Sequence, residues 1–219
     1  MLARILYFIG WSGSHLYATL YHRYCVFGRR HVSPAGRSAL IAANHASYVD
    51  PSMVGIAFRH RVVFLARTTL FEHNRFARWL LPKINAMPIS RERLDLGTLR
   101  KLQQLCARGE QIVIFPEGTR TPDGALQRAH AGVGLLADTL KADILPVYVH
   151  GTYDAFPRHS AWPRPVKITT CVGPPLPIAP YASLPRGRER YEHIAHDIMA
   201  AITRLQTALL RLERRRRRR

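Results

Sequence analysis

The residues best suited to chemistry lie in two short segments. The first, from Asn44 to Asp50, reads NHASYVD and places a carboxylate five positions after a histidine. The second, from Phe115 to Arg120, supplies a carboxylate, a glycine turn, a hydroxyl and a guanidinium in its last four residues. A histidine oriented by an aspartate can act as a general base, and a guanidinium can hold a phosphate. The two segments together predict a reaction centre.

The spacing of His45 and Asp50 carries little information alone, because such pairs arise often by chance. Its context carries more. The apolar run from Ser38 to Ala43 is typical of a buried strand, and so is the run from Gln111 to Phe115. Ligands of open α/β sheets bind beyond the carboxyl ends of the strands. We therefore expect both motifs to converge at one edge of a sheet.

Each residue of the first motif suits a particular role. A neutral His45 can remove a hydroxyl proton, because an imidazole titrates near neutrality. Asp50 can accept the other ring N–H and stabilise the imidazolium that forms. A serine nucleophile is not required if the attacking alcohol is itself the substrate, so Ser47 is interpreted as a structural or hydrogen-bonding residue.

The second motif predicts a phosphate site. Arg120 offers bidentate geometry, Thr119 adds a hydroxyl, and Gly118 lets the backbone turn closely around a ligand. Glu117 is expected to bond substrate hydroxyls or to fix a neighbouring arginine. The alternative for both motifs is purely structural, with His45 and Asp50 capping a helix and the second motif forming a surface turn.

Strands and helices alternate along the chain, which predicts an α/β fold with a mixed, mainly parallel sheet flanked by helices. Pro146 predicts an edge or a bulge in its strand. The further predicted strands are residues Val62–Ala66, Met87–Ser90, Ile144–Val149 and Val166–Val172. Five helices are predicted. One begins just after Asp50, and one is capped by Asp95 and ends near Gly109. The other three cover Asn74–Leu81, Gly132–Leu140 and Glu189–Leu212.

The chain divides into three predicted parts. Residues 1–30 are expected to associate with a membrane, 31–186 to form the catalytic domain, and 187–219 to form an amphipathic helix with an arginine tail. The apolar stretch from Ile5 to Tyr21 suits an interfacial helix or a helix packed on the domain, and no cleavage site for a signal peptide follows it. The six arginines from Arg214 to Arg219 suit docking on acidic headgroups or a solvated end.

The charge of the chain predicts anionic partners. It has 33 Lys and Arg against 14 Asp and Glu in 219 residues, a net charge of +19. Phosphate-bearing substrates, acidic lipids, an acidic carrier protein and nucleic acid all fit such a charge. No recognised nucleic-acid-binding module is present, so nucleic acid is not expected. No cluster of His and Cys has the spacing of metal ligands, so no metal is expected.

The motifs resemble those of the glycerolipid acyltransferases, the family of 1-acyl-sn-glycerol-3-phosphate acyltransferase, from about Ser38 to Pro177. In that family the His and Asp of the first motif are the catalytic pair. Arg91 closes a segment similar to the second motif and is a further candidate phosphate ligand. Two positions depart from the pattern, since Ala86 stands where Gly is usual and His130 where Lys is frequent. The segments that carry the resemblance are Asn44–Asp50, Ala86–Arg91, Phe115–Arg120 and Ile144–Val147.

The resemblance implies transfer of a fatty acyl group to the free hydroxyl of lysophosphatidic acid (1-acylglycerol 3-phosphate), giving phosphatidic acid. The donor would be acyl-CoA or acyl-carrier protein, and no cofactor is needed. We expect anionic membrane lipids as partners and a location at the cytoplasmic face of the membrane. The alternatives are another acceptor, such as a lyso-ornithine lipid, or a basic nucleic-acid-binding protein. A catalytically silent lipid-binding relative is disfavoured by the intact pair of His45 and Asp50.

Overall fold

The computed structural model describes residues 2–72, 75–89, 95–157 and 159–218. Its centre is a seven-stranded sheet in the order β1-β7-β6-β2-β5-β3-β4. The five strands from β6 to β4 in this order are parallel, whereas β7 and β1 run in the opposite direction. The predicted mixed, mainly parallel sheet is therefore confirmed. The strands are β1 (Cys25–Phe27), β2 (Ala39–Ala43), β3 (Val62–Arg67), β4 (Ala86–Ile89), β5 (Gln111–Ile114), β6 (Ile144–His150) and β7 (Thr169–Val172).

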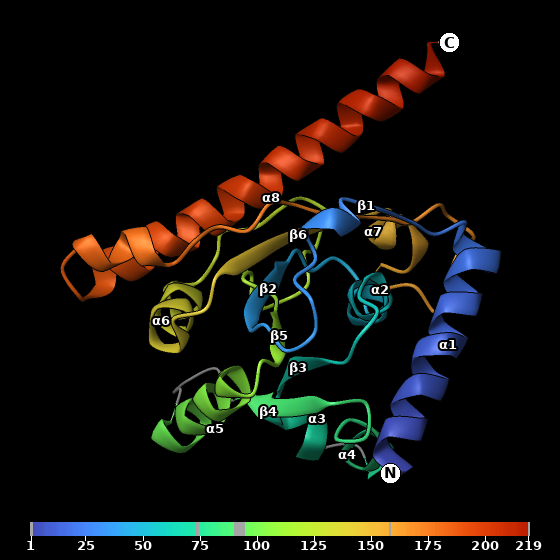
Figure 1. Cartoon of the computed structure of the whole chain (residues 1–219). Helices are drawn as coiled ribbons and strands as arrows, with labels where there is room; N and C mark the ends of the chain where they lie inside the picture. Colours follow the sequence, from blue (N-terminus) through green and yellow to red (C-terminus); the bar gives the residue numbers. More distant parts are fainter. Residues whose placement is uncertain (1, 73–74, 90–94, 158, 219) are drawn as a thin grey trace.

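Helices cover both faces of this sheet (Figure 1). On β2, Leu40 and Ala42 join the core cluster of α5, α6 and α8, whereas Ile41 and Ala43 join that of α1 and α2. Successive side chains of a strand point to opposite faces, so β2 is buried on both. The helices are α1 (Leu2–His22), α2 (Asp50–Ala57), α3 (Thr68–Glu72), α4 (Arg75–Leu80), α5 (Leu96–Ala107), α6 (Ala131–Leu140), α7 (Thr152–Ala155) and α8 (Arg188–Arg217), with 3₁₀ turns η1 (Arg29–His31) and η2 (Ala179–Ser183).

Most elements lie where the sequence predicts them. Asp95 caps α5 by accepting the N–H of Thr98 at 2.8 Å. The short strand β1 and the helix α3 were not expected. Two residues of predicted elements, Asn74 and Ser90, lie outside the described residues.

The edge position predicted for Pro146 is wrong, because β6 lies inside the sheet between β2 and β7. The alternative, a bulge, agrees with the isolated bridge between Ile144 and Leu176, which is one residue out of register with the pairing of β6 and β7. The antiparallel pairing of β6 with β7 begins one residue after Pro146, at Val147. Beyond it, Gly173 donates its N–H to the Pro146 carbonyl at 2.9 Å. The proline is tolerated because it stands where the pairing with β7 ends.

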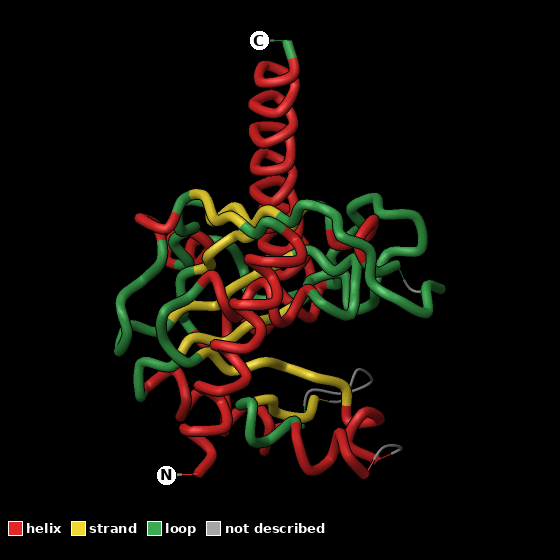
Figure 2. The backbone as a smooth tube through the Cα atoms, turned by 90° about the vertical axis from the view of Figure 1, so that its right-hand side faces the viewer, coloured by secondary structure: helices red, strands yellow, loops and turns green. Residues whose placement is uncertain are grey.

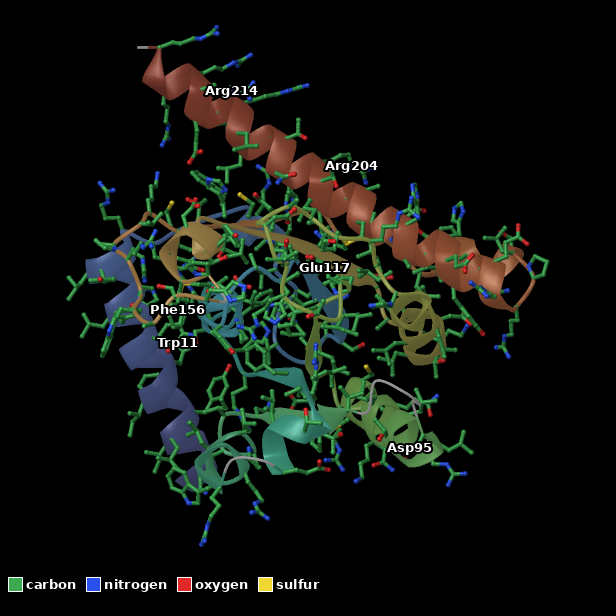
Figure 3. The ribbon with its side chains drawn as sticks, turned by 180° about the vertical axis from the view of Figure 1, so that it is seen from behind. Trp11, Asp95, Glu117, Phe156, Arg204 and Arg214 are labelled. Atoms are coloured by element: carbon green, nitrogen blue, oxygen red, sulfur yellow. The ribbon has the colours of Figure 1, made fainter. Side chains whose placement is uncertain are left out.

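Helix α1 has two different faces. Its inner face packs on the domain, where Ala18 is buried and the Trp11 indole donates to the Phe58 carbonyl at 3.1 Å (Figure 3). The sequence left open an interfacial helix or a helix packed on the domain. Helix α1 has both a face that packs on the domain and an exposed apolar face. No helix in the described part of the chain is long and apolar enough to cross a membrane. The exposed apolar side chains of α1 are Ile5, Phe8, Ile9, Leu16, Tyr17, Leu20 and Tyr21.

Helix α8 packs through its first part and extends freely through its last. Arg190 forms a buried ion pair with Asp138 of α6 at 3.1 Å, and Gln206 donates to the Tyr148 hydroxyl at 3.2 Å. Contacts with the domain continue to Glu213, whose carboxylate lies 3.6 Å from His150 Nε2, and the end of the helix projects beyond the domain (Figure 2). The arginine run is helical from Arg214 to Arg217, and Arg214, Arg215, Arg216 and Arg218 are exposed (Figure 3).

The topology places the carboxyl ends of β2 and β5 next to each other, since the two strands are neighbours in the sheet. The chain leaves β2 toward the face covered by α2 and leaves β5 toward the face covered by α6. Connections that depart to opposite faces leave room for a ligand between them. The two motifs follow these two strands.

Candidate active site

His45 and Asp50 form a hydrogen-bonded pair. The His45 Nδ1 lies 2.9 Å from Asp50 Oδ2, and the imidazole is 19% exposed. Asp50 is fully buried at the start of α2, where the same oxygen accepts the N–H groups of Ala46 and Ser47, each at 2.6 Å. These two amides fix the carboxylate. Among the described residues no hydrogen bond reaches His45 Nε2, so this nitrogen can face a ligand.

Glu117 ties the two motifs together. Its Oε1 accepts the His45 N–H at 2.9 Å, and its Oε2 accepts the Gln127 N–H at 3.2 Å. The His45 carbonyl in turn accepts the Thr121 N–H at 2.9 Å. Glu117 is 2% exposed and lies in the interior of the domain (Figure 3). With both oxygens on backbone amides, this carboxylate suits positioning of His45 better than contact with substrate hydroxyls.

An aromatic ring fixes the other side of the histidine. Phe115, the first residue of the second motif, stacks on the His45 imidazole with ring centroids 4.2 Å apart and an interplanar angle of 23°. The ring plane is thus set by Phe115, the residue directly after β5, while the ring rotation is set by Asp50. A base held in this way needs little reorganisation before it accepts a proton.

Gly118, Thr119 and Arg120 form the turn that follows. Gly118 has φ of 63° and donates its N–H to the Phe115 carbonyl at 2.9 Å, so a residue with a side chain would be strained there. Thr119 is exposed. The Arg120 guanidinium lies 3.4 Å from the centroid of the Tyr48 ring, and its Nη1 is buried without a hydrogen-bond partner among the described residues. This leaves donors for an anion.

Comparison with known proteins settles the family. A family model described as Acyltransferase matches residues 25–150, more than half of the chain. The chain belongs to the acyltransferase family. It is 29% identical over 178 residues to the 1-acyl-sn-glycerol-3-phosphate acyltransferase of Bacillus subtilis, covering 80% of this chain and 85% of that protein.

Two further relatives of this acyltransferase are more distant. The chloroplastic 1-acyl-sn-glycerol-3-phosphate acyltransferase LPAT1 of Arabidopsis thaliana is 22% identical over 68% of this chain, which spans 42% of that protein. The crystal structure of the 1-acyl-sn-glycerophosphate acyltransferase PlsC from Thermotoga maritima superposes with a TM-score of 0.66 at 22% identity. It covers 89% of this chain and 77% of that one. The structural likeness establishes the fold.

Sequence reasoning missed three residues around the candidate site. Arg67, at the carboxyl end of β3, donates from Nη2 to the Gly118 carbonyl at 3.0 Å. Tyr48 supports Arg120, and Phe156 accepts the Ser47 hydroxyl at 2.6 Å through its carbonyl. Arg67 could have been predicted as a site residue, because it is a cation directly after the predicted strand Val62–Ala66. Ser47 is fully buried and bonded, in agreement with the expectation of a structural residue.

Three further positions were singled out from the sequence, namely Ala86, Arg91 and His130. Arg91 is outside the described residues, so its position is not assigned. His130 precedes α6 with an exposed side chain, and its N–H donates to the Pro116 carbonyl at 3.0 Å. Ala86 begins β4, and the left-handed residue of its turn is Asn85, with φ of 68°, so alanine fits at position 86. Within the described residues, no group of three or more His, Cys, Asp or Glu side chains could hold a metal ion.

The burial of Glu117 makes stability depend on pH. Desolvation raises the pKa of this carboxyl from its ordinary 4.5 to about 7. The folded chain then binds more protons than the unfolded chain between these values, so the free energy of unfolding falls as the pH rises from 4.5 to 7. We expect the contribution of Glu117 to the free energy of unfolding to fall by up to about 3 kcal/mol as the pH rises over this range.

The Glu117→Gln variant should lack this pH dependence, and urea denaturation at pH 5 and pH 7.5 measures it. Glu189→Gln, which changes an exposed glutamate of α8, should retain the wild-type dependence. Equal pH dependence in wild type and Glu117→Gln would show that Glu117 titrates normally.

Proposed function

We propose that this acyltransferase moves a fatty acyl group from acyl-CoA or acyl-carrier protein to the free hydroxyl of 1-acylglycerol 3-phosphate, giving phosphatidic acid. The observation that carries the proposal is the meeting of a histidine–aspartate pair and an arginine turn at neighbouring strand ends. His45 and Asp50 follow β2, and Arg120 follows β5. A base beside a phosphate clamp suits an acceptor that carries its hydroxyl close to a phosphate.

The proposed reaction is direct transfer. His45 Nε2 removes the acceptor hydroxyl proton as the oxygen attacks the thioester carbonyl, while Asp50 accepts the Nδ1–H and stabilises the imidazolium. The tetrahedral intermediate then collapses, the carbon–sulfur bond breaks, and the leaving thiolate takes the proton from the imidazolium. No acyl-enzyme is required, and the Ser47 hydroxyl is already bonded to the Phe156 carbonyl.

The acceptor phosphate is proposed to bind at the turn of Gly118 to Arg120, with Arg91 as a further candidate ligand. The Arg120 guanidinium has an unpartnered buried nitrogen, and Thr119 presents an exposed hydroxyl. Guanidinium and phosphate form bidentate, charge-assisted hydrogen bonds. The printed names of the relatives support a phosphate-bearing acceptor, since they are 1-acyl-sn-glycerol-3-phosphate acyltransferases.

Tyr48 offers a test of how this arginine is held. The Tyr48→Leu variant removes the ring beneath Arg120, so the Km for the acceptor should rise about three- to tenfold at unchanged kcat. Tyr48→Phe keeps the ring and should behave like wild type. Steady-state kinetics with varied acceptor and saturating donor measure both variants. An equal rise in Km for Tyr48→Phe would mean that the hydroxyl, not the ring, matters.

We also propose that the protein associates with the cytoplasmic face of a membrane. The exposed apolar side chains of α1 suit insertion at the level of the headgroups, and the exposed arginines of α8 suit acidic lipids. Sedimentation with phosphatidylglycerol vesicles tests the membrane association, with phosphatidylcholine vesicles as the control. Binding to the anionic vesicles should weaken as salt increases.

The activity is tested with the purified full chain, acyl-CoA or acyl-carrier protein, and a panel of lysolipids, with the products identified by mass. Phosphatidic acid formed from 1-acylglycerol 3-phosphate is the expected main product. Preferred acylation of a lyso-ornithine lipid would leave His45 as the base, oriented by Asp50. It would replace 1-acylglycerol 3-phosphate by this lipid as the acceptor. A gel shift on DNA or RNA without thioester release would favour the nucleic-acid-binding alternative.

A further inference from the structure

A basic hollow of about 400 Å³ lies at the opposite edge of the sheet from the candidate active site. Its lining comes from the segments that precede β2 and β3, next to the end of α2. Its lining residues include three arginines, one histidine and one serine, and none of them is acidic. The polar lining residues are Arg29, Arg30, Ser33, Arg59 and His60.

The arginines come from two triplets separated by thirty positions, Arg29-Arg30-His31 and Arg59-His60-Arg61. The first triplet forms the turn η1, which is fixed to the end of β7. Gly28 has φ of 75°, and a Cβ on it would collide with the Val172 carbonyl oxygen. The His31 Nδ1 lies 3.0 Å from that same oxygen. The first triplet is therefore held rigidly.

The second triplet is fixed on both sides. Before it, the buried Phe58 accepts the Trp11 indole N–H through its carbonyl at 3.1 Å. At its end, Arg61 donates from Nη2 to Asn85 Oδ1 at 2.9 Å. Arg59 and His60 lie between these two anchors, so the position of their backbone beside the hollow is set by the fold.

The positive charge of the hollow is uncompensated. Within the described residues, neither Arg29 nor Arg59 makes an ion pair, and Arg30 donates from Nε to the His31 ring at 3.3 Å. The His60 Nε2 is buried without a hydrogen-bond partner among those residues. The end of α2 supplies only about half a negative charge. Arg29, Arg30 and Arg59 are exposed, so their side chains are accessible to an anion from solution.

Asp143 does not neutralise this charge. It lines an adjoining hollow of about 240 Å³, where its carboxylate lies 3.9 Å from Arg37. The larger hollow thus keeps three guanidiniums for an outside anion. Guanidinium groups with a nearby hydroxyl are the donors that proteins use for phosphate.

We propose that this hollow is a second phosphate-binding site, separate from the one proposed at Arg120. The five residues of β2 span about 16 Å and lie between the two sites, so one phosphate cannot serve both. The ligand is the phosphate group of an anionic lipid lying beside α1, or a free phosphate. Its recognition needs Arg29 and Arg59 and does not depend on the acyltransferase reaction.

The test measures binding of inorganic phosphate by calorimetry at constant ionic strength. The parent is the full chain with Arg120→Ala, which removes the proposed acceptor clamp. Adding Arg29→Gln or Arg59→Gln should weaken phosphate binding about tenfold or more, because each removes a charge-assisted contact. Arg100→Gln changes an exposed arginine of α5 by the same charge and should weaken binding less than twofold.

Equal weakening by Arg100→Gln and Arg59→Gln would overturn the proposal, because the effect would then follow net charge alone. Absence of saturable binding to the parent would overturn it too. Soluble dihexanoyl phosphatidic acid distinguishes the two ligand sources. Tighter binding of this lipid than of phosphate, lost in Arg59→Gln, supports a lipid headgroup, whereas equal and Arg59-dependent binding supports phosphate alone.

Discussion

Replacing His45 by alanine is expected to lower kcat by about 10²- to 10⁴-fold while the chain remains folded. The loss is the usual contribution of a positioned general base. The structure predicts little unfolding because the imidazole makes one side-chain hydrogen bond, and Asp50 keeps both backbone amides that hold it. Circular dichroism and thermal unfolding measure the fold, and thioester release at saturating substrates measures kcat.

The control for this variant is His196→Ala, which changes an exposed histidine of α8 and should leave kcat within twofold. Asp50→Asn should also lower kcat, because an amide cannot stabilise the imidazolium as a carboxylate does. Near-normal turnover by a folded His45→Ala variant would rule out the proposed mechanism.

Replacing Arg120 by alanine is expected to raise the Km for the acceptor about 10- to 100-fold and to change kcat and the donor Km little. A hydrogen bond from a guanidinium to a charged group contributes about 1.5–3 kcal/mol, which corresponds to this range. Arg120→Lys keeps the charge without the bidentate geometry, so it should restore part of the affinity. Initial rates at varied acceptor and saturating donor give these values.

A phosphate-free acceptor is the matched control for the Arg120 variant. If Arg120 holds the acceptor phosphate, its loss should not affect acylation of a lyso-ornithine lipid. A rise in the donor Km with an unchanged acceptor Km would place the phosphates of the donor at this turn. Double replacement of Tyr48 by leucine and Arg120 by alanine should add nothing to Arg120→Ala, because the ring acts through the guanidinium.

The fold and the pairing within the first motif were predictable because they rest on local rules. The apolar runs define the strands, and parallel strands bring their carboxyl ends to one edge. The short segment from His45 to Asp50 then closes on itself, since Asp50 begins a helix and accepts two amides just before it. These relations span few residues, and sequence patterns resolve them.

The parts that sequence reasoning missed depend on neighbours distant in the chain. Glu117 accepts the N–H of His45, which lies 72 positions earlier in the chain. The sequence instead suggested a contact between Glu117 and substrate hydroxyls or an arginine. Arg67 reaches Gly118 only because β3 pairs with β5, an order that the sequence does not state. The interior position of Pro146 likewise follows from the placement of β7 beside β6.

The contact between Glu117 and the backbone of His45 has a consequence for which hydroxyl can react. Because the proposed base and the proposed phosphate clamp are joined through this carboxylate and the Thr121 amide, their separation is set by the protein, not by the lipid. An acceptor must then carry its hydroxyl a fixed number of bonds from its phosphate. Regiochemistry, the choice of one hydroxyl among isomeric lysolipids, is accordingly determined by the backbone segments that connect the ends of two strands.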